Sequence, residues 1–484
     1  MIPAAGLGLL VLVALGIVFT GLPAFVILIG AATIGATLGV ASDTVPLSLL
    51  GALPSRLINL FENDLLQALP LYVTMGLLLD RLPVADALYR AGLSLLPRRP
   101  AAPLVSGMAL GALLGPMNGS VGASVLALSR VIAPRLAESG VPKPTQFAAV
   151  AVASTLGVVI PPSLVLILLG DAMLSAHTIA VTATGRADRV INTQDVFHGA
   201  LAPAAIFLVL CLALSWRAGR RIPASAAAPP LKLNRKQAVL AAVTLIALLT
   251  LLGGVAIGYF YAVEAAAMGA FVLLSAGLLT GALRGAVLRG ILHDALAITG
   301  ALFALLIAAT SLTLVLRLLG TDRLVGDWIT GIPGHEIVVV AIVLGAIGLT
   351  AFVLDAFEII FVIVPIAVPP LLIRVADARW ISVLVLLTLQ TSFLLPPFGY
   401  ALMMARGTLR LTLNLRELIR ALLPFLIAQW TVLAAVLLFP HPVHLGENAG
   451  EASRSPAAPM TDQELQRRLQ QMLPPPPEFE PPGR

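Results

Sequence analysis

Apolar segments long enough to cross a lipid bilayer recur along this chain, and they decide which solvent it folds in. Residues 4–20, 238–257 and 424–439 contain no charged side chain. At about 1.5 Å per residue, about 20 helical residues cross the roughly 30 Å of hydrocarbon in a bilayer. Only 11% of the 484 residues are charged and 59% are hydrophobic, which leaves too few charges to cover a water-facing surface. We therefore expect an all-α polytopic membrane protein, and a soluble enzyme is excluded.

Two of the expected membrane helices contain a Pro-Pro pair. The stretch GVVIPPSLVL contains Pro161 and Pro162, and FLLPPFGYAL contains Pro396 and Pro397. Proline has no amide hydrogen and disfavours helix at the preceding residue, so each pair divides its helix and frees carbonyl groups. Free carbonyls are tolerated in a membrane only where protein or a polar cavity receives them. A single pair could be a kink packed by its neighbours, but two matching pairs favour a binding site at the membrane midplane.

Other features repeat at the distance that separates the two proline pairs, which is 235 residues. Residues 118–120 correspond to 353–355, and the segment that begins at Leu69 corresponds to one that begins near Ala304. In the first half we expect five crossings, at residues 4–20, 22–40, 65–80, 146–170 and 198–216. Because five is odd, the second half is predicted to be inserted upside down, as an inverted repeat.

The predicted organisation has four parts. The first half spans 1–216, with a re-entrant hairpin at about 104–135 and a broken helix at about 146–170. A basic linker at 217–237 precedes the second half at 238–440, which has a re-entrant hairpin at about 338–373 and a broken helix at about 381–404. A proline-rich tail at 441–484 is expected to be largely disordered.

The charges of the loops predict the orientation. Residues 217–236 hold six basic side chains and no acidic one, so the positive-inside rule places this loop in the cytoplasm. The basic segments 81–103 and 405–420 then also lie inside, whereas 42–64 and the tail, which are both net acidic, lie outside. Every loop tested agrees, and both termini are predicted to be periplasmic or in the equivalent compartment. The net charge of +6 reflects this rule, and nucleic-acid binding is not expected.

The tip of the first hairpin combines flexible backbone with side-chain oxygens. In GALLGPMNGSVGAS, an apolar run is interrupted by Asn118, Gly119 and Ser120, and Ser124 follows. The glycines could serve only close helix packing. Packing alone would not require Asn118 and Ser120, so a binding role is favoured.

The second hairpin holds two carboxylates, Asp355 and Glu358, inside the apolar run AFVLDAFEIIFVIVPIAVPP. A carboxylate within a membrane is costly and is by default a functional candidate, as a cation ligand or proton carrier. Asp355 is favoured because it matches Ser120 in the repeat. Glu358 could instead pair with a basic residue, and Glu264 could instead accept a backbone hydrogen bond at a helix start.

The candidate substrate- and ion-binding residues come from both hairpins and both breaks. They are Asn118, Gly119, Ser120, Ser124, Thr155, Gly157, Pro161, Pro162, Asp355, Glu358, Thr391, Ser392, Pro396 and Pro397.

Five segments resemble a known family: LPLYVTMGLLLDR, STLGVVIPPSLVLILLGD, YAVEAAAMGA, LDAFEIIFVIVPIAVPP and LLPPFGYALMMARG. Together they are similar to the large membrane subunit of tripartite ATP-independent periplasmic (TRAP) transporters, in the ion-transporter superfamily of elevator-type carriers. The resemblance covers roughly nine tenths of the chain. The segments GPMNGSVGASVLALSRV and LLGDAMLSAHT resemble the sequences of the family branch that is labelled for mannitol or chloroaromatic compounds.

The resemblance implies sodium-driven uptake of an organic anion, commonly a carboxylate, across a bacterial inner membrane. It implies two partners, a small membrane subunit with four spans and a periplasmic solute-binding protein. It also implies that the hairpins and broken helices form a mobile transport domain, with sodium as coupling ion and no other cofactor. The sodium ligands implied by the family pattern are Asn118, Ser120, Gly157, Asp355 and Thr391.

The chain departs from the family pattern in places. Many members have a Ser-Gly-Ser type of tip where this chain has Asn118-Gly119-Ser120, although asparagine still offers an oxygen. The segment 177–194, with Arg186 and Arg189, and the tail are longer than usual. Both are either docking surfaces for the binding protein or plain surface loops.

Three other functions are weighed against a tripartite importer. A stand-alone carrier of the same superfamily would bind its substrate without help. An intramembrane enzyme would need a nucleophile and base, or a metal cluster, but the six histidines fall in predicted loops or at helix ends. Cys211 is the only cysteine, which excludes intrachain disulfides. A primary pump is disfavoured because no phosphate-binding loop motif is present.

Overall fold

The computed structural model describes residues 3–43, 45–96, 99–186, 189–222, 233–396, 399–409, 411 and 413–445, and its regular elements in these ranges are all helices. Eight of the described helices are long and apolar enough to cross a membrane, or nine if the bent pair of α5 and α6 is one span. This confirms the prediction of an all-α polytopic membrane protein. Pro397, residues 223–232 of the predicted linker and the tail from residue 446 lie outside the described residues.

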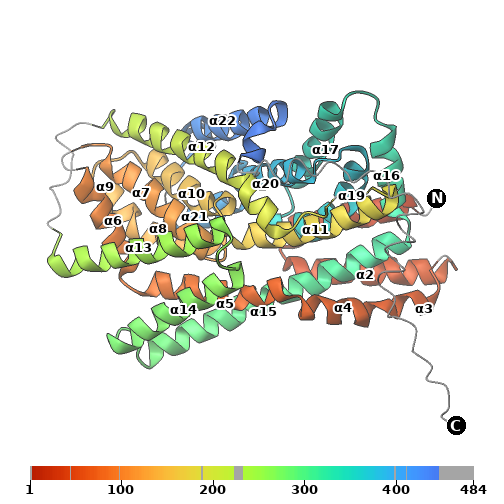
Figure 1. The fold of residues 1–484 in the computed structure, drawn as a ribbon, viewed down its shortest axis with the longest axis horizontal. Coiled ribbons are helices and arrows are strands. Elements are labelled where there is room, and N and C mark those ends of the chain that lie inside the picture. The colour runs from red at the N-terminus through yellow and green to blue at the C-terminus, as the bar shows by residue number, and fades with distance from the viewer. Residues whose placement is uncertain are drawn as a thin grey trace, which may run out of the picture.

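One layer of the protein consists of long helices that pack side by side (Figure 1). Its members are α2 (Ala24–Ala41), α5 (Asp64–Arg81), α14 (Ala262–Leu279) and α15 (Ala286–Leu318). The helix α15 packs on both α2 and α5, and α14 packs on α5. Two further helices flank this layer, α1 (Pro3–Thr20) on α2 and α13 (Arg235–Ile257) on α14. We call the four members the α15 layer.

The second layer contains the hairpins and the broken helices. The first hairpin is α7 (Ala102–Leu114), η1 (Gly115–Met117) and α8 (Val121–Val131), followed by α9 (Ala133–Glu138). The second is α17 (Glu336–Thr350), α18 (Ala356–Glu358), the π-helix η3 (Ile359–Ile363) and α19 (Val364–Arg374). The broken helices are α10 (Lys143–Val159) with α11 (Leu164–Thr184), and α20 (Ala378–Leu394) with α21 (Tyr400–Leu409). The outer helices are α12 (Thr193–Gly219) and α22 (Leu415–Leu438).

The core of the protein surrounds α10 and α20. Nearly every residue of these two helices is buried, as expected for helices that are apolar on all sides. They pack on each other, and both pack on α22. The first proline break and the end of α20 therefore lie inside the protein, where freed backbone groups find partners other than lipid.

The order of elements repeats with the offset seen in the sequence. Adding 235 to the bounds of α10 gives exactly those of α20 (378–394), and α7, α2 and α1 correspond within three residues to α17, α14 and α13. The helix α6 (Val84–Leu95) corresponds in the same way to α16 (Thr321–Gly331). This agreement supports the duplication, while the inverted insertion and the boundaries of the four parts remain predictions.

Two segments that were expected to be loops contain short helices. They are α4 (Ala52–Glu62) and α6. None of the residues of α4 is buried, and its sequence ALPSRLINLFE mixes apolar and polar residues as a helix in the membrane interface does. The connection α3 (Leu47–Leu50) precedes it. The loop prediction was wrong here because a short amphipathic helix carries no long apolar run.

The histidines are a second correction. His177 and His293 lie inside α11 and α15 rather than in loops or at helix ends, whereas His198 lies in the second turn of α12. The helix α11 extends well beyond the predicted boundary at residue 170 because apolar residues such as Ile179 and Ala180 continue it. His177 is buried, and its Nδ1 accepts a hydrogen bond from the Ile191 amide at 3.1 Å. No group of three or more metal-ligating side chains occurs within the described ranges.

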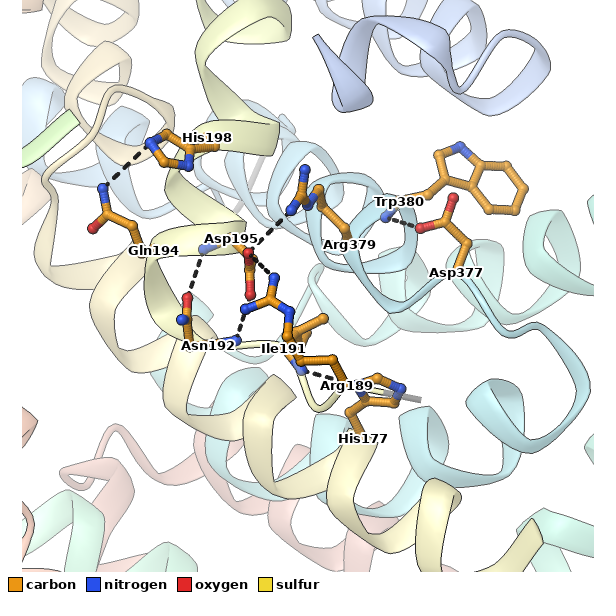
Figure 2. A network of polar contacts seen from close by, with 10 residues as sticks. All are labelled: His177, Arg189, Ile191, Asn192, Gln194, Asp195, His198, Asp377, Arg379 and Trp380. Atoms are coloured by element: carbon orange, nitrogen blue, oxygen red, sulfur yellow. Dashed lines mark hydrogen bonds and ion pairs between the residues drawn. The ribbon is translucent and has the colours of Figure 1, made fainter. Parts of the chain in front are cut away.

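A polar network joins the start of α12 to the start of α20 (Figure 2). The carboxylate of Asp195 forms ion pairs with Arg189 at 2.7 Å and with Arg379 at 3.0 Å. It also accepts a hydrogen bond from the Asn192 amide at 2.8 Å. Asp195 and Arg379 are largely buried, with side-chain exposures of 8% and 11%. Figure 2 shows the Asp195 carboxylate between the two guanidinium groups.

The arginines of the segment 177–194 bind groups of this chain. Arg189 pairs with Asp195. Arg186 donates at 2.5 Å to the carbonyl of Leu372, near the end of α19. Both guanidinium groups therefore have partners within this chain, and the docking and surface-loop interpretations of this segment both remain predictions.

Candidate functional site

The tip of the first hairpin is held by its own polar side chains. Gly119 has a φ of +68°, a left-handed conformation that favours glycine. Ser120 then begins α8, and its Oγ accepts from the Ala123 amide at 3.1 Å. The buried Asn118 donates from Nδ2 to Ser124 Oγ at 3.1 Å. The sequence-predicted residues Asn118, Gly119, Ser120 and Ser124 thus form one bonded loop.

The first break has the geometry that its prolines require. The helix α10 ends before Ile160, whose ψ of 117° is extended, and Pro161 and Pro162 follow. Ser163 begins α11, since its Oγ accepts from the Leu166 amide at 3.2 Å and donates to the Val158 carbonyl at 2.9 Å. The Ser163 hydroxyl therefore satisfies one of the carbonyls that are free at the end of α10.

Two further hydroxyl groups lie just before this break. Ser154 and Thr155 donate to carbonyls one turn back in α10, at 2.7 and 2.9 Å. Because each hydroxyl donates only one hydrogen, its oxygen keeps lone pairs that can face a ligand.

The first hairpin and the first break meet at two glycines. A methyl group added at Gly157 would lie under 3.0 Å from the backbone of Gly115, and one added at Gly115 would also lie under 3.0 Å from the backbone of Gly157. Beside this contact is a cavity of about 20 Å³, which is enough for a single water-sized occupant. Its polar lining is Ser120, Ser124, Ser154 and Ser163, together with the backbone of Gly119 and Gly157. The sequence-predicted Thr155 does not line it.

The second hairpin places its two carboxylates at the tip. Asp355 begins α18, and its Oδ1 accepts from the Ala356 amide at 2.8 Å. Glu358 ends α18 and is 6% exposed, and its Oε2 has no hydrogen-bond partner among the described residues. A buried carboxylate oxygen is costly unless a proton or a cation accompanies it. This tip is therefore a candidate cation site.

A cavity of about 280 Å³ joins this tip to the second break. Asp355, Glu358, Ser392 and Tyr400 supply its polar lining. Thr391 does not line it, and its hydroxyl donates to the Leu387 carbonyl at 2.9 Å. Pro396 lies in the turn between α20 and α21. Ser392 thus lines the same cavity as the two carboxylates, whereas its neighbour Thr391 does not.

The helix α21 connects the two halves of the site. It packs on α8 of the first hairpin, and a methyl group added at Gly122 of α8 would lie 2.7 Å from Tyr400 Oη. Tyr400 also lines the cavity of Asp355 and Glu358. Oxygen atoms from both hairpins and from the ends of α10 and α20 therefore lie in one region, and its two cavities are candidate sites for small cations.

Sequence reasoning missed four polar residues of this region and its surroundings. They are Ser154, Ser163, Tyr400 and Asp171. Asp171 lies in α11 and accepts from Asn63 Nδ2 at 2.9 Å, so it is an intramembrane carboxylate that links α11 to the segment before α5. Each of these residues interrupts an apolar run, which is the signal that could have identified them.

Glu264 has the structural role weighed for it in the sequence. Its Oε2 accepts from the Tyr261 amide at 3.0 Å at the start of α14, which confirms the interpretation as a helix-start acceptor. It lies in the α15 layer and lines neither cavity described above.

Gly157→Ala tests the contact between the first hairpin and the first break. The added methyl group must displace the backbone of Gly115, so we expect a destabilisation of about 1–3 kcal/mol and slower transport. Thermal unfolding in detergent checks the first effect. Gly253→Ala is the matched control, because nothing lies within 4 Å of the methyl group in α13. Equal unfolding temperatures for the two variants would contradict the close contact.

Comparisons with known proteins extend these observations. The family described as "Tripartite ATP-independent periplasmic transporter, DctM component" matches residues 9–441. The C4-dicarboxylate TRAP transporter large permease protein DctM of Rhodobacter capsulatus is 23% identical over 408 residues, which cover 82% of this chain and 88% of the relative. The crystal structure of the Alcanivorax borkumensis YdaH transporter superposes with a TM-score of 0.59 at 15% identity, covering 81% of this chain and 88% of that one. This last likeness concerns the fold.

Proposed function

The chain belongs to the DctM component family of tripartite ATP-independent periplasmic transporters, and on this premise we propose that it is a permease that imports an organic acid with sodium as the coupling ion. The family is a class of transporters, and the chain is a large permease of that class. The observation that carries the sodium proposal is the buried pair of Asp355 and Glu358 beside a polar cavity.

Sodium is the coupling ion whose ligand preference matches this region. Hard cations prefer oxygen ligands, and the region offers carboxylate, hydroxyl and backbone oxygens. Asp355 and Glu358 would hold one ion, since a cation offsets the cost of burying their charge. Ser120 and the backbone around Gly157 would hold a second ion at the smaller cavity. Asn118 and Thr391 would support the two sites rather than line them.

Sodium and substrate would be coupled through charge. An organic carboxylate entering this region meets Asp355 and Glu358, which repel it while they are ionised. A bound cation removes that repulsion, so the two ligands favour each other's binding. The name of the Rhodobacter capsulatus relative refers to C4-dicarboxylates, which supports an organic acid as the substrate class here.

The architecture supports an elevator mechanism. The hairpins and broken helices would move as one body against the α15 layer and carry the site across the membrane. The word tripartite in the family description supports two partners, a small membrane subunit with four spans and a periplasmic solute-binding protein. The loop charges support a bacterial inner membrane location with both termini in the periplasm.

Uptake by proteoliposomes tests this function against a stand-alone carrier. The vesicles contain the chain and its small membrane partner, and the binding protein is added or omitted under an imposed sodium gradient or none. We expect uptake of a labelled dicarboxylate only with both the gradient and the binding protein. Uptake without the binding protein would favour the stand-alone carrier. Uptake that ignores the gradient would contradict sodium coupling.

A further inference from the structure

Two carbonyls of the second hairpin lack the amide that an α-helix would pair with them. In an α-helix the amide of residue 365 would bond the Phe361 carbonyl, and the amide of residue 369 would bond the Pro365 carbonyl. Both residues are prolines in this chain, and proline has no amide hydrogen. The same stretch begins with the π-helix η3, and such local widening of a helix is frequent at functional sites.

Two side chains of α15 donate to these carbonyls. Thr313 Oγ1 donates to the Phe361 carbonyl at 3.0 Å, and Arg317 Nη2 donates to the Pro365 carbonyl at 3.3 Å. The donors are four residues apart, and so are the acceptors. Successive turns of α15 therefore contact successive turns of the hairpin. Thr313 is buried, and Arg317 is a half-buried charge near the end of a membrane span.

The first half has a polar link at the corresponding place. Arg130 of α8 pairs with Asp80 of α5 at 2.8 Å. Adding 235 to 130 gives Pro365, and adding it to 80 gives residue 315, which lies between Thr313 and Arg317. In each half, therefore, a polar contact joins the second arm of the hairpin to the equivalent helix of the α15 layer.

We propose that Thr313 and Arg317 are positioning residues for cation binding, a role that rests on the proposed function. Through the carbonyls that Pro365 and Pro369 leave free, they fix η3 and the start of α19 against α15 in this conformation, and the proposed movement of the hairpins against the α15 layer would break both bonds. Glu358 immediately precedes η3. Fixing η3 therefore holds Glu358 and Asp355 in the arrangement that a cation requires.

The test combines the loss of each side-chain donor with replacement of the proline that lacks the corresponding backbone amide. Thr313→Val keeps the shape of the side chain and removes the donor. Pro365→Ala restores an amide hydrogen that the Phe361 carbonyl can accept within its own helix. We expect Thr313→Val to raise the sodium concentration for half-maximal uptake about two- to tenfold, with the maximal rate at saturating sodium changed less than about twofold. In the Pro365→Ala background the same substitution should have less than about a twofold effect.

Two further variants complete the design. Arg317→Met with Pro369→Ala is the second pair and should behave in the same way. Ser311→Ala is the matched control, because its hydroxyl donates at 2.7 Å to the Ile307 carbonyl of its own helix, and it should leave the sodium dependence unchanged. An unchanged half-saturation in Thr313→Val, or an equal effect in both backgrounds, would overturn the proposal.

Hydrogen exchange separates this proposal from the proposed function. In the purified complex without substrate, Thr313→Val should speed exchange of the η3 amides about two- to tenfold, and Pro365→Ala should restore their protection. If the wild type takes up substrate without sodium, the proposed function fails, while the exchange experiment still measures the link between α15 and the hairpin. Unchanged exchange in Thr313→Val would overturn that link whatever the uptake shows.

Discussion

Asp355→Asn is expected to reduce sodium-driven uptake about 100-fold, as the loss of a buried charge-assisted interaction does. Asparagine keeps a side-chain oxygen that can accept from the Ala356 amide, so the start of α18 should remain intact. Only the negative charge is lost, and that charge is what holds a cation beside Glu358 in the cavity of about 280 Å³. Initial rates of uptake at several sodium concentrations, with expression and folding checked, measure the effect.

Glu264→Gln is the control matched to this substitution. Glu264 is also a carboxylate that accepts a backbone amide at a helix start, but it lies in α14, away from both cavities. Its neutral isostere keeps an oxygen that can accept from the Tyr261 amide, so uptake should stay within about twofold of the wild type. If Asp355→Asn retains full sodium dependence, or if both variants lose activity alike, Asp355 does not hold the coupling ion.

The ends of the two helices before the proline pairs agree with the sequence because the signal for them is local. Proline removes an amide wherever it stands, so the ends of α10 and α20 follow from the two Pro-Pro pairs. The equivalence of Ser120 and Asp355 was also predicted from the repeat offset. Each begins the second arm of its hairpin and accepts a backbone amide through its side chain.

The sequence did not predict which of these pieces meet. The contact between Gly115 and Gly157, and the place of Tyr400 between α8 and the second hairpin, join segments that are far apart in the chain. Such contacts depend on how whole helices pack. The roles of Thr313 and Arg317 could not be predicted from the sequence for the same reason, since their partners lie 48 residues away.

Asp195→Asn is expected to destabilise the protein by about 3–5 kcal/mol, because it removes one partner of a buried ion pair. Asparagine can still accept from the Asn192 amide, so the start of α12 should be kept. The substitution takes the carboxylate away from Arg379, whose side chain is only 11% exposed. The unfolding temperature of the purified protein measures the loss.

Two comparisons decide whether the ion pair causes this loss. Glu138→Gln removes the carboxylate of an exposed pair with Arg135 and should cost about 0–1 kcal/mol. Adding Arg379→Met to Asp195→Asn should recover part of the stability, since replacing both partners avoids an uncompensated buried charge. A double variant less stable than Asp195→Asn alone would mean that Arg379 stabilises the start of α20 through its other contacts. In that case contacts of Arg379 other than the one to Asp195 that Figure 2 shows would hold the second broken helix.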